Sequence, residues 1–484
     1  MKLRELLRDI PVTAIHANLD TEIGDVSYDS RSTKPGDLFV AVRGFETDGH
    51  RYIPMALEKG AAAVLCEDAP GEKASYILTG DSRLALAVAS RNYFGDPASR
   101  MAVIGVTGTN GKTTSTLLLK HVLEDTLGAK VGLIGTNGNL IGDREIPSER
   151  TTPESYVLQK LFREMADEGC THAVMEVSSH ALDQYRVAGF RFAAGVFTNL
   201  TQDHLDYHGT MEAYAAAKAR FFPLCAKAAL NLDDAWAGYY LDRGGCPMTG
   251  FGIASPAAEL RGTDIRLFPD RVSFRAVRGG EAAEVNLGIP GRFSVYNALG
   301  VLACAGLLGI PQDRAAASLA TARGVRGRVE PVPTAPDYTV LIDYAHTPDA
   351  LENVLRTVRE SAQGRVVALF GCGGDRDRKK RPIMGKIGTE LSDFAVITSD
   401  NPRTEDPGDI IREIVAGVTV PESRYAVIPD RREAIAWALE HHEPGDVIVL
   451  AGKGHETYQE INHVKYPMDE REIVRKIRER RKDL

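Results

Sequence analysis

The chain has 484 residues, of which 43% are hydrophobic and 26% are charged, with a formal net charge of -8. At roughly 150 residues per domain, this length predicts about three domains rather than one enlarged core. The negative charge argues against a general binder of phosphate backbones, so nucleic acid is not an expected partner.

The first predicted domain spans residues 1–97 and contains short apolar runs at residues 37–42 and 61–65. Helical patterns lie beside these runs, which is typical of a small α/β domain. We expect this domain to end near Asp96 and Pro97.

The second predicted domain spans residues 98–331 and begins with an apolar strand over residues 103–106, a glycine loop and a helix. Further strands at residues 173–177 and 195–198 alternate with helical stretches. This order predicts a central, mostly parallel P-loop-type sheet with helices on both faces. Residues 260–285 are less regular, and we expect an added antiparallel patch there.

The third predicted domain spans residues 332–484 and has strands at residues 340–343, 366–370 and 447–451. The α/β alternation predicts a Rossmann-like domain. The charged residues 475–482 end a predicted helix, and a solvated face is favoured there over a nucleic-acid patch.

Cysteine use and the first residues bear on the compartment. The six cysteines are scattered singly, without the C-x-x-C pair that zinc and redox sites use. Residues 1–9 mix both charge signs, unlike a signal peptide, and no apolar run is long enough to span a membrane. We therefore expect a cytoplasmic protein without a membrane span, and a monomer by default.

A glycine loop between the second domain's first strand and helix predicts an ATP site with Mg²⁺. Its glycines let backbone N–H groups converge on phosphates, Lys112 reaches the terminal phosphates, and Thr113 offers a hydroxyl to the ion. The usual G-x-x-x-x-G-K-[ST] spacing would need glycine at Val106, so the match is to a shorter form, and a chance glycine turn is the alternative. The loop residues are Gly108, Thr109, Asn110, Gly111, Lys112, Thr113 and Thr114.

Polar segments follow two of the central strands, where ligands sit in such sheets. Glu176 and His204 in these segments are suited to a divalent ion with phosphate oxygens, whereas an ordinary core or surface position is the alternative. Lys218 lies in a predicted amphipathic helix, where a lysine is normally solvated.

The segment GVTGTNGKTT at residues 105–114 resembles the ATP-binding segment of the Mur ligases, which build the cell-wall peptide and are related to folylpolyglutamate synthases. The segments at residues 175–180, 198–206 and 343–348 match the family in order. The resemblance therefore covers essentially the whole chain in three blocks. It implies an enzyme, an ATP-dependent amide-forming ligase of peptidoglycan precursor synthesis.

The resemblance also implies site residues. Lys112, Lys218, Glu176 and His204 are expected to be catalytic, with Lys218 carbamylated, and Thr113, Glu176, His204 and the modified Lys218 are expected to hold Mg²⁺. Asn297, Arg328 and His346 are expected to contact ATP; a helix cap, a domain hinge and a turn are the respective alternatives.

For the substrate UDP-N-acetylmuramoyl-L-alanyl-D-glutamate (UDP-MurNAc-L-Ala-D-Glu), the resemblance implies hydroxyl, amide and guanidinium groups suited to a diphosphate and a carboxylate. The loop at residues 45–47 and the position of Arg150 vary within the family. The implied residues are Tyr28, Ser30, Phe45, Glu46, Thr47, Thr151, Thr152, Ser178, Gln184 and Arg186.

Segments at residues 371–382 and 400–403 resemble family members that add meso-2,6-diaminopimelate. Arg403 offers a rigid fork to the distal carboxylate that lysine lacks, and losing such a pair in a dry pocket costs roughly 1.5 to 3 kcal/mol. Glu456 suits an ammonium, although its segment also fits a glycine turn after a strand. The implied residues are Arg376, Asp400, Asn401, Pro402, Arg403, Gly452 and Glu456.

We expect ATP to phosphorylate the γ-carboxylate of the D-glutamyl residue, and the amine of meso-diaminopimelate to attack the acyl phosphate while domain closure excludes water. Alternatives are the same reaction with L-lysine, and a D-alanyl-D-alanine-adding or folate-extending ligase, which Arg403 and its neighbours argue against. A non-catalytic sensor of the cell-wall precursor is a further alternative, but it would not need Glu176, His204 and Lys218.

Overall fold

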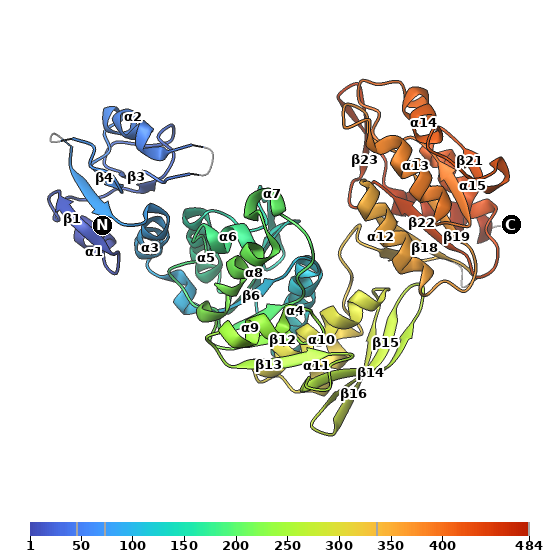
Figure 1. Ribbon diagram of the computed structural model, residues 1–484, viewed down its shortest axis with the longest axis horizontal. Coiled ribbons are helices and arrows are strands. Elements are labelled where there is room, and N and C mark those ends of the chain that lie inside the picture. The colour runs from blue at the N-terminus through green and yellow to red at the C-terminus, as the bar shows by residue number, and fades with distance from the viewer. Residues whose placement is uncertain (45–46, 72–73, 335–336, 483–484) are drawn as a thin grey trace. The chain divides into compact units, whose positions relative to one another are not determined.

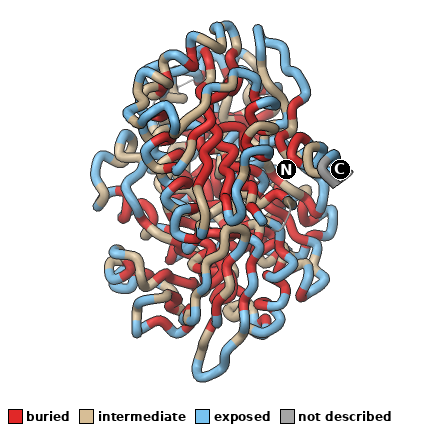
Figure 2. The backbone as a smooth tube through the Cα atoms, turned by 90° about the vertical axis from the view of Figure 1, so that its right-hand side faces the viewer, coloured by how far each residue is buried: buried red, intermediate tan, exposed pale blue. Residues whose placement is uncertain are grey.

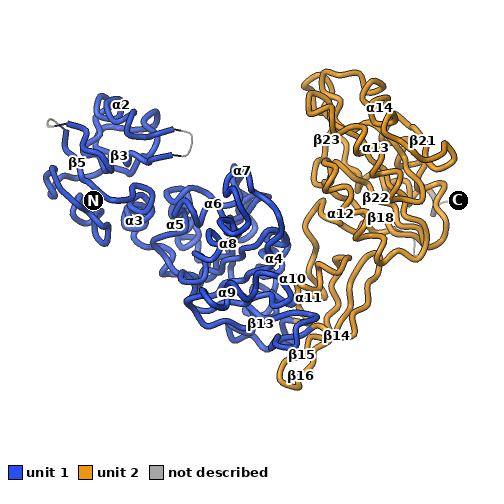
Figure 3. The backbone as a smooth tube through the Cα atoms, in the orientation of Figure 1, with its two compact units in different colours: residues 1–261, 299–315 blue, residues 262–298, 316–484 orange. Residues whose placement is uncertain are grey.

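The computed structural model describes residues 1–44, 47–71, 74–334 and 337–482. The chain divides into two compact units (Figure 3), residues 1–261 with 299–315 and residues 262–298 with 316–484. Each unit is an assembly of mainly parallel sheet and helices (Figure 1), as the α/β pattern predicts. The three domain boundaries expected from the sequence stay a prediction.

The first sheet has five strands in the order β1-β5-β4-β3-β2. β1 is antiparallel to β5 and the other pairs are parallel. The strands expected at residues 37–42 and 61–65 are β3 and β4. The bounds are α1 (Leu3–Leu6), β1 (Val12–His16), β2 (Val26–Ser27), β3 (Leu38–Val40), α2 (Ile53–Glu58), β4 (Ala63–Cys66), β5 (Tyr76–Thr79) and α3 (Ser82–Phe94).

The central sheet of unit 1 runs in the order β13-β12-β11-β6-β10-β7-β8-β9. It is parallel from β13 to β7, and β8 and β9 add an antiparallel edge, so the mostly parallel prediction is confirmed. Its strands are β6 (Ala102–Thr107), β7 (Val131–Gly135), β8 (Gly138–Ile141), β9 (Arg144–Ile146), β10 (His172–Glu176), β11 (Ala194–Phe197), β12 (Ala228–Asn231) and β13 (Met248–Gly252). The helices are α4 (Lys112–Leu127), α5 (Ser155–Asp167), α6 (Ser179–Asp183), α7 (Leu205–His208), α8 (Met211–Ala219) and α9 (Ala237–Arg243).

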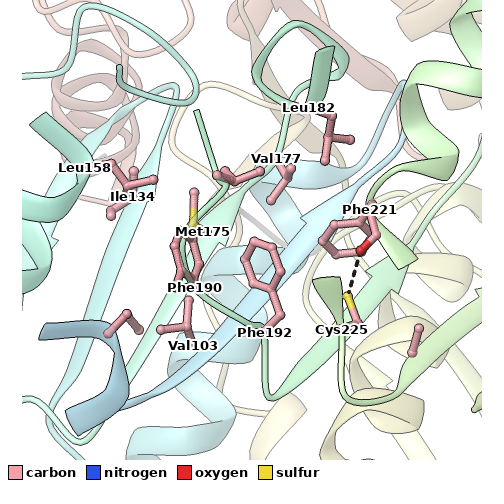
Figure 4. Close-up of a cluster of buried hydrophobic side chains, with 14 of the residues drawn as sticks. Val103, Ile134, Leu158, Met175, Val177, Leu182, Phe190, Phe192, Phe221 and Cys225 are labelled. Carbon is pink, nitrogen blue, oxygen red and sulfur yellow. Dashed lines mark hydrogen bonds between the residues drawn. The ribbon is translucent and has the colours of Figure 1, made fainter. Parts of the chain in front are cut away.

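The strands of this sheet carry apolar residues on both faces, and helices cover both faces and bury these residues. On one face, Val103 of β6 and Met175 of β10 pack in one cluster with Leu158 of α5 (Figure 4). On the other face, a Cβ on Gly300 of α10 (Arg292–Leu307) would lie 3.2 Å from Cγ1 of Val196 in β11. The sheet is therefore rigidly packed beneath the loops that leave its strand ends.

The irregular stretch from residue 260 forms β14 (Leu260–Leu267), β15 (Val272–Arg278) and β16 (Glu281–Leu287). β15 and β16 pair antiparallel from Val272 opposite Leu287 to Arg278 opposite Glu281. The expected antiparallel patch is confirmed. Helix α11 (Gln312–Leu319) follows α10.

The sheet of the last third has the order β17-β18-β22-β19-β20-β21, with β17 antiparallel and the rest parallel. One face packs on Leu351 of α12 and Met384 of α13, the other on Ile435 of α15, and the inner strands β19 and β22 are buried throughout (Figure 2). Its strands are β17 (Glu330–Val332), β18 (Thr339–Asp343), β19 (Val366–Phe370), β20 (Phe394–Ile397), β21 (Tyr425–Val427) and β22 (Val447–Ala451). A separate antiparallel pair follows, β23 (Tyr458–Ile461) and β24 (Val464–Pro467). The helices are α12 (Pro348–Arg359), α13 (Lys380–Glu390), α14 (Pro407–Val415), α15 (Arg431–Glu440) and α16 (Glu470–Lys482).

The charged cluster near the C-terminus lies on α16. Arg475 pairs with Glu479 at 3.2 Å and Lys476 with Glu472 at 3.6 Å, with all four side chains about half exposed or more. These pairs fit the solvated helix face expected from the sequence. Among the described residues, no helix combines the length and apolar character that crossing a membrane requires.

Candidate functional site

The glycine loop runs from the end of β6 to the start of α4 at Lys112. A Cβ on Gly108 would lie 1.9 Å from Oγ1 of Thr198, so only glycine lets the loop lie this close to the end of β11. Val106, where the usual motif has glycine, is a fully buried β6 residue between Glu176 and Val196. The first turn of α4 thus presents its free N–H groups beside the loop, as an anion site requires.

Two lysine ammonium groups meet at this loop. Lys112 donates through Nζ to the carbonyl oxygens of Gly108 at 2.9 Å and Thr109 at 2.8 Å. Lys218 donates through Nζ to the same Gly108 oxygen at 2.9 Å, and its side chain is buried, so the solvated alternative for this lysine is wrong. Burial, reinforced by the Lys112 charge, lowers the pKa of Lys218 well below its usual value. Burial also lowers the pKa of Lys112, while Glu176 acts in the opposite direction.

Glu176 is the last residue of β10, and its buried carboxylate is held in one orientation. Oε1 accepts from the backbone N–H of Thr136 at 2.9 Å, and Oε2 accepts from the Thr136 hydroxyl at 3.1 Å. His204 precedes α7 in a left-handed conformation (φ 53°), with Nε2 3.5 Å from Oδ2 of Asp203.

The donors around the loop fit Mg²⁺ bound together with phosphates. Glu176 and Thr113 supply the oxygen donors that this ion prefers. The described residues contain no group of three or more His, Cys, Asp or Glu side chains placed to hold a metal ion by themselves. An ion at this position would therefore need phosphate oxygens or water among its ligands.

A cavity of about 370 Å³ opens at the carboxyl ends of β7 and β10. Thr152 shapes its floor, since its hydroxyl donates to the carbonyl of Glu176 at 2.9 Å and accepts from the N–H of Ser178 at 3.1 Å. Arg186 donates to the Thr152 carbonyl at 3.0 Å and to Oε1 of Gln184 at 2.6 Å. The lining residues are Thr136, Ser148, Glu149, Arg150, Thr151, Thr152, Ser178, His180, Arg186 and His204.

Glu154, the N-terminal cap of α5, lies close to three guanidinium groups beside this cavity. Its Oε2 lies 3.5 Å from Arg186 Nε, 3.9 Å from Arg150 Nη1 and 4.0 Å from Arg83 Nη1. Arg83 comes from the N-terminal segment, so this carboxylate joins that segment to the cavity wall. The cluster gives the cavity edge positive charge, which suits a diphosphate or a carboxylate.

The predicted residues of the N-terminal segment are less closely grouped. The ring centroids of Tyr28 and Tyr156 lie 6.1 Å apart. Burial, and to a smaller extent the nearby Glu154 charge, raises the pKa of Tyr28, which indicates that this tyrosine lies near the Glu154 cluster. Ser30 is buried and donates to Sδ of Met55 at 3.4 Å. Thr47 is exposed, and Phe45 and Glu46 lie outside the described residues.

A second cavity, of about 620 Å³, opens at the carboxyl ends of β18, β19, β20 and β22. Such strand ends are the usual ligand position in an open parallel sheet. Six of the seven residues predicted for diaminopimelate line it, and Pro402 does not. They are Arg376, Asp400, Asn401, Arg403, Gly452 and Glu456.

Arg403 enters this cavity from a left-handed backbone conformation (φ 50°), which is uncommon for arginine and marks functional positions. Nη1 donates to the Gly374 carbonyl at 2.7 Å, and Nε lies 3.4 Å from Oε2 of Glu460. Nη2 makes no hydrogen bond to any residue that the structure describes. A Cβ on Gly452 (φ 113°) would lie 2.5 Å from Oδ2 of Asp400, so this glycine leaves room for a carboxylate.

The other three predicted nucleotide contacts belong to unit 2. Asn297 lies inside α10, so the helix-cap alternative is wrong, and its buried Nδ2 has no hydrogen-bond partner among the described residues. Arg328 is exposed, with its guanidinium 5.8 Å from the centroid of the Tyr344 ring. His346 lines the 620 Å³ cavity, and its Nδ1 lies 2.8 Å from the Tyr344 carbonyl.

Sequence reasoning missed several residues of these two sites, among them Thr136, His180, Lys380 and Lys453. Thr136 orients Glu176, and its position directly after an apolar run was the available signal. His180 lines the smaller cavity, and burial beside His204 and His208 lowers its pKa to about 4. Lys380 lines the larger cavity, and Lys453 lies beneath it, bonded to two of its lining residues.

Three protein-family models match the chain. They are described as Mur ligase family, catalytic domain (residues 22–99), Mur ligase middle domain (106–305), and Mur ligase, glutamate ligase domain (327–454). The matches follow one another along the chain in the order of the three predicted domains.

Similar proteins match over nearly the whole chain. A protein of Clostridium tetani named UDP-N-acetylmuramoyl-L-alanyl-D-glutamate–2,6-diaminopimelate ligase is 45% identical, with 99% of each chain covered. One of Clostridium botulinum with the same name is 44% identical, also with 99% of each covered. A solved structure of a ligase of that name has a TM-score of 0.80 at 32% identity, covering 100% of this chain and 99% of the other.

Proposed function

We propose that the chain, which belongs to the Mur ligase family, adds meso-2,6-diaminopimelate to UDP-MurNAc-L-Ala-D-Glu in a reaction that converts ATP to ADP and phosphate. It is an ATP-dependent ligase of peptidoglycan precursor synthesis. The observation that carries the amino-acid assignment is the 620 Å³ cavity, which presents the Arg403 guanidinium and the Glu456 carboxylate together. Opposite charges in one cavity suit an amino acid end, which carries both an ammonium and a carboxylate.

Meso-diaminopimelate has two such ends, and the charges of the cavity indicate which end is held and which end reacts. A carboxylate next to an amine favours its protonated form, whereas the attacking amine must lose its proton. Glu456 and Arg403 therefore hold the end that does not react. Lysine lacks the distal carboxylate, which leaves Arg403 Nη2 unpaired at a cost of about 1.5 to 3 kcal/mol, or roughly a tenfold to hundredfold preference.

The glycine loop is the proposed ATP site. The N–H groups at the start of α4 receive phosphate oxygens, and Lys112 leaves the Gly108 and Thr109 carbonyls to offset the charge of the terminal phosphate. Asn297, whose buried Nδ2 lacks a hydrogen-bond partner in the described part of the chain, and Arg328 and His346 are proposed further contacts to the nucleotide.

Thr113, Glu176, His204 and a carbamylated Lys218 are the residues proposed to hold Mg²⁺. When bound, this ion offsets the charge of the phosphates and of the carboxylate that they approach. Thr136 fixes the Glu176 carboxylate through two hydrogen bonds, so this donor is oriented in advance. Carbamylation would convert Lys218 from a cation that repels Lys112 into an anion that attracts it.

The 370 Å³ cavity is the proposed position of the UDP-MurNAc-dipeptide end. Thr151, Thr152 and Ser178 offer hydroxyl groups there, and Arg186 and Arg150 offer positive charge. Glu176 links this cavity to the glycine loop. The Thr152 hydroxyl at the cavity donates to the Glu176 carbonyl, and the Glu176 charge acts to raise the pKa of Lys112 in the loop. The γ-carboxylate of the D-glutamyl residue is thus proposed to meet the terminal phosphate near Glu176, forming the acyl phosphate that the free amine attacks.

The proposal extends to a monomeric, cytoplasmic enzyme with domains at residues 1–97, 98–331 and 332–484. Its test is phosphate release from purified protein with ATP, Mg²⁺ and UDP-MurNAc-L-Ala-D-Glu, with meso-diaminopimelate or L-lysine as the amine. Release that depends on meso-diaminopimelate is expected. Release only with lysine would contradict the substrate, and release that needs no amine would contradict ligation.

A further inference from the structure

Lys453 is a fully buried lysine directly beneath the amino-acid cavity. It follows β22 and precedes the cavity residue Glu456 by three positions. Its Nζ donates to Oδ1 of Asn401 at 2.7 Å and to Oε2 of Glu456 at 2.5 Å. Both partners line the cavity, whereas Lys453 does not. The ammonium therefore acts on the cavity wall from behind.

The contact with Lys453 fixes which way the Asn401 amide faces. An ammonium can only donate, so the Asn401 atom next to it must be the oxygen. The backbone N–H of Glu460 donates to the same oxygen at 2.9 Å, and Asn401 Nδ2 donates to Oε2 of Glu456 at 2.9 Å. The amide donors are thus turned toward Glu456 and the cavity.

Lys453 also determines which oxygen of Glu456 is free. Oε2 accepts from both Lys453 and Asn401, whereas Oε1 makes no hydrogen bond to any described residue. Because Oε2 is held by two hydrogen bonds, the carboxylate has one orientation and Oε1 points in a defined direction. The Lys453 ammonium compensates the charge of this carboxylate when water leaves the cavity.

We propose that Lys453 is a positioning residue for amine recognition, which locks Asn401 and Glu456 so that Oε1 of Glu456 receives the ammonium at the unreactive end of the amino-acid substrate. The inference rests on the proposed function, because it takes this cavity as the diaminopimelate site. Lys453 itself touches no substrate. It acts through the two residues that do.

The test compares Lys453→Met with the wild type in steady-state phosphate release with varied meso-diaminopimelate, ATP and UDP-MurNAc-L-Ala-D-Glu. We expect KM for meso-diaminopimelate to rise at least tenfold, with KM for ATP and for the UDP-sugar dipeptide within twofold of wild type. Lys453→Arg, which keeps the charge, is expected to recover part of the loss. An unchanged KM for meso-diaminopimelate in Lys453→Met overturns the inference.

Lys465→Met is the matched control. Lys465 is exposed and lies over the ring of Tyr458 at 4.1 Å, the same ring that Lys453 faces at 5.2 Å, but it has no bond to Asn401 or Glu456. We expect this variant to keep all three KM values. An equal effect in both variants would assign the loss to the Tyr458 contact and contradict the role of the Asn401 and Glu456 bonds.

The double variant Lys453→Met with Glu456→Gln covers the case in which the single variant does not fold, because it leaves no half-buried carboxylate without its cation. Only the Asn401 contact remains to be lost once Glu456 is replaced, so we expect the double variant to raise KM for meso-diaminopimelate less than tenfold above Glu456→Gln alone. A further rise of tenfold or more, as independent sites give, overturns the inference. A wild type without amine-dependent release would instead refute the proposed function, so the two failures are distinguishable.

Discussion

Lys112 and Lys218 donate to one acceptor, the carbonyl oxygen of Gly108, each at 2.9 Å. Burial lowers the pKa of Lys218 well below its usual value, and repulsion between the two ammonium groups on this one oxygen adds to the effect. A lysine that loses its proton readily is nucleophilic and can take up CO₂ as a carbamate. The arrangement therefore supplies the chemical condition for the carbamylation that the family resemblance implies.

Lys218→Gln tests this arrangement. The amide keeps a donor for the Gly108 carbonyl but removes the amine, so we expect turnover to fall about a hundredfold or more while the melting temperature stays within a few degrees. The measurement is phosphate release, together with ¹³C NMR of protein equilibrated with labelled bicarbonate. The wild type should show a carbamate signal that the variant lacks, and full activity of Lys218→Gln would refute the role.

Arg403→Ala is expected to weaken selection of the amino acid. Nη2 of its guanidinium makes no hydrogen bond to the described residues and is available to the substrate. Removing the guanidinium should raise KM for meso-diaminopimelate roughly tenfold to a hundredfold and reduce the preference for meso-diaminopimelate over lysine. The assay is kcat/KM for each amine. Arg412→Ala, an exposed arginine of α14, is the control and should change neither value. An unaltered preference in Arg403→Ala would exclude the arginine as the selector.

The sequence was sufficient for features that depend on neighbouring residues. The apolar run of β6, the glycines and the start of α4 are contiguous, so the loop was predictable. Three of the four strands whose ends form the second cavity, β18, β19 and β22, were predicted as well, but β20 was not. Long-range pairing was not predictable in the same way. The sequence does not reveal that β22 lies between β18 and β19, which brings Gly452 next to Asp400.

Burial was the other quantity that local pattern could not supply. Lys218 has the spacing of a solvated helix lysine, and it is buried only because α8 lies against the glycine loop, which is distant in sequence. Asn297 resembled a cap residue, although α10 begins five residues earlier. Lys453 gave no signal of its own, since its partner Asn401 is 52 positions away.

Arg186→Ala is expected to affect only the UDP-sugar dipeptide. The guanidinium bonds Thr152 and Gln184 at the 370 Å³ cavity, so we expect KM for this substrate to rise about tenfold with KM for ATP unchanged. Steady-state kinetics with each substrate varied in turn is the measurement. A parallel rise in both KM values would indicate a general structural role instead.

Glu405 predicts a pH dependence of stability. The Arg381 guanidinium, bonded to both Glu405 oxygens at 2.7 and 2.9 Å, lowers the pKa of Glu405 to about 2. Because the pKa is lowered in the folded state, the stabilisation is present above the unfolded pKa and is lost as the pH falls toward 2. Urea unfolding should show Glu405→Gln less stable by about 1.5 kcal/mol at pH 7, with a smaller difference below pH 4.

Glu422→Gln is the control for that series, because Glu422 is exposed. Its stability should follow the wild type at every pH. A difference between wild type and Glu405→Gln that grows as the pH falls would contradict the assigned sign.

The central claim is that this ligase joins diaminopimelate to the UDP-sugar dipeptide. Mass spectrometry of the product measures this directly when purified protein receives ATP, Mg²⁺, UDP-MurNAc-L-Ala-D-Glu and equal amounts of meso-diaminopimelate and L-lysine. The account predicts a UDP-sugar tripeptide that carries diaminopimelate and is formed with one phosphate released per product. A product that carries mainly lysine, or phosphate release without any tripeptide, would contradict it.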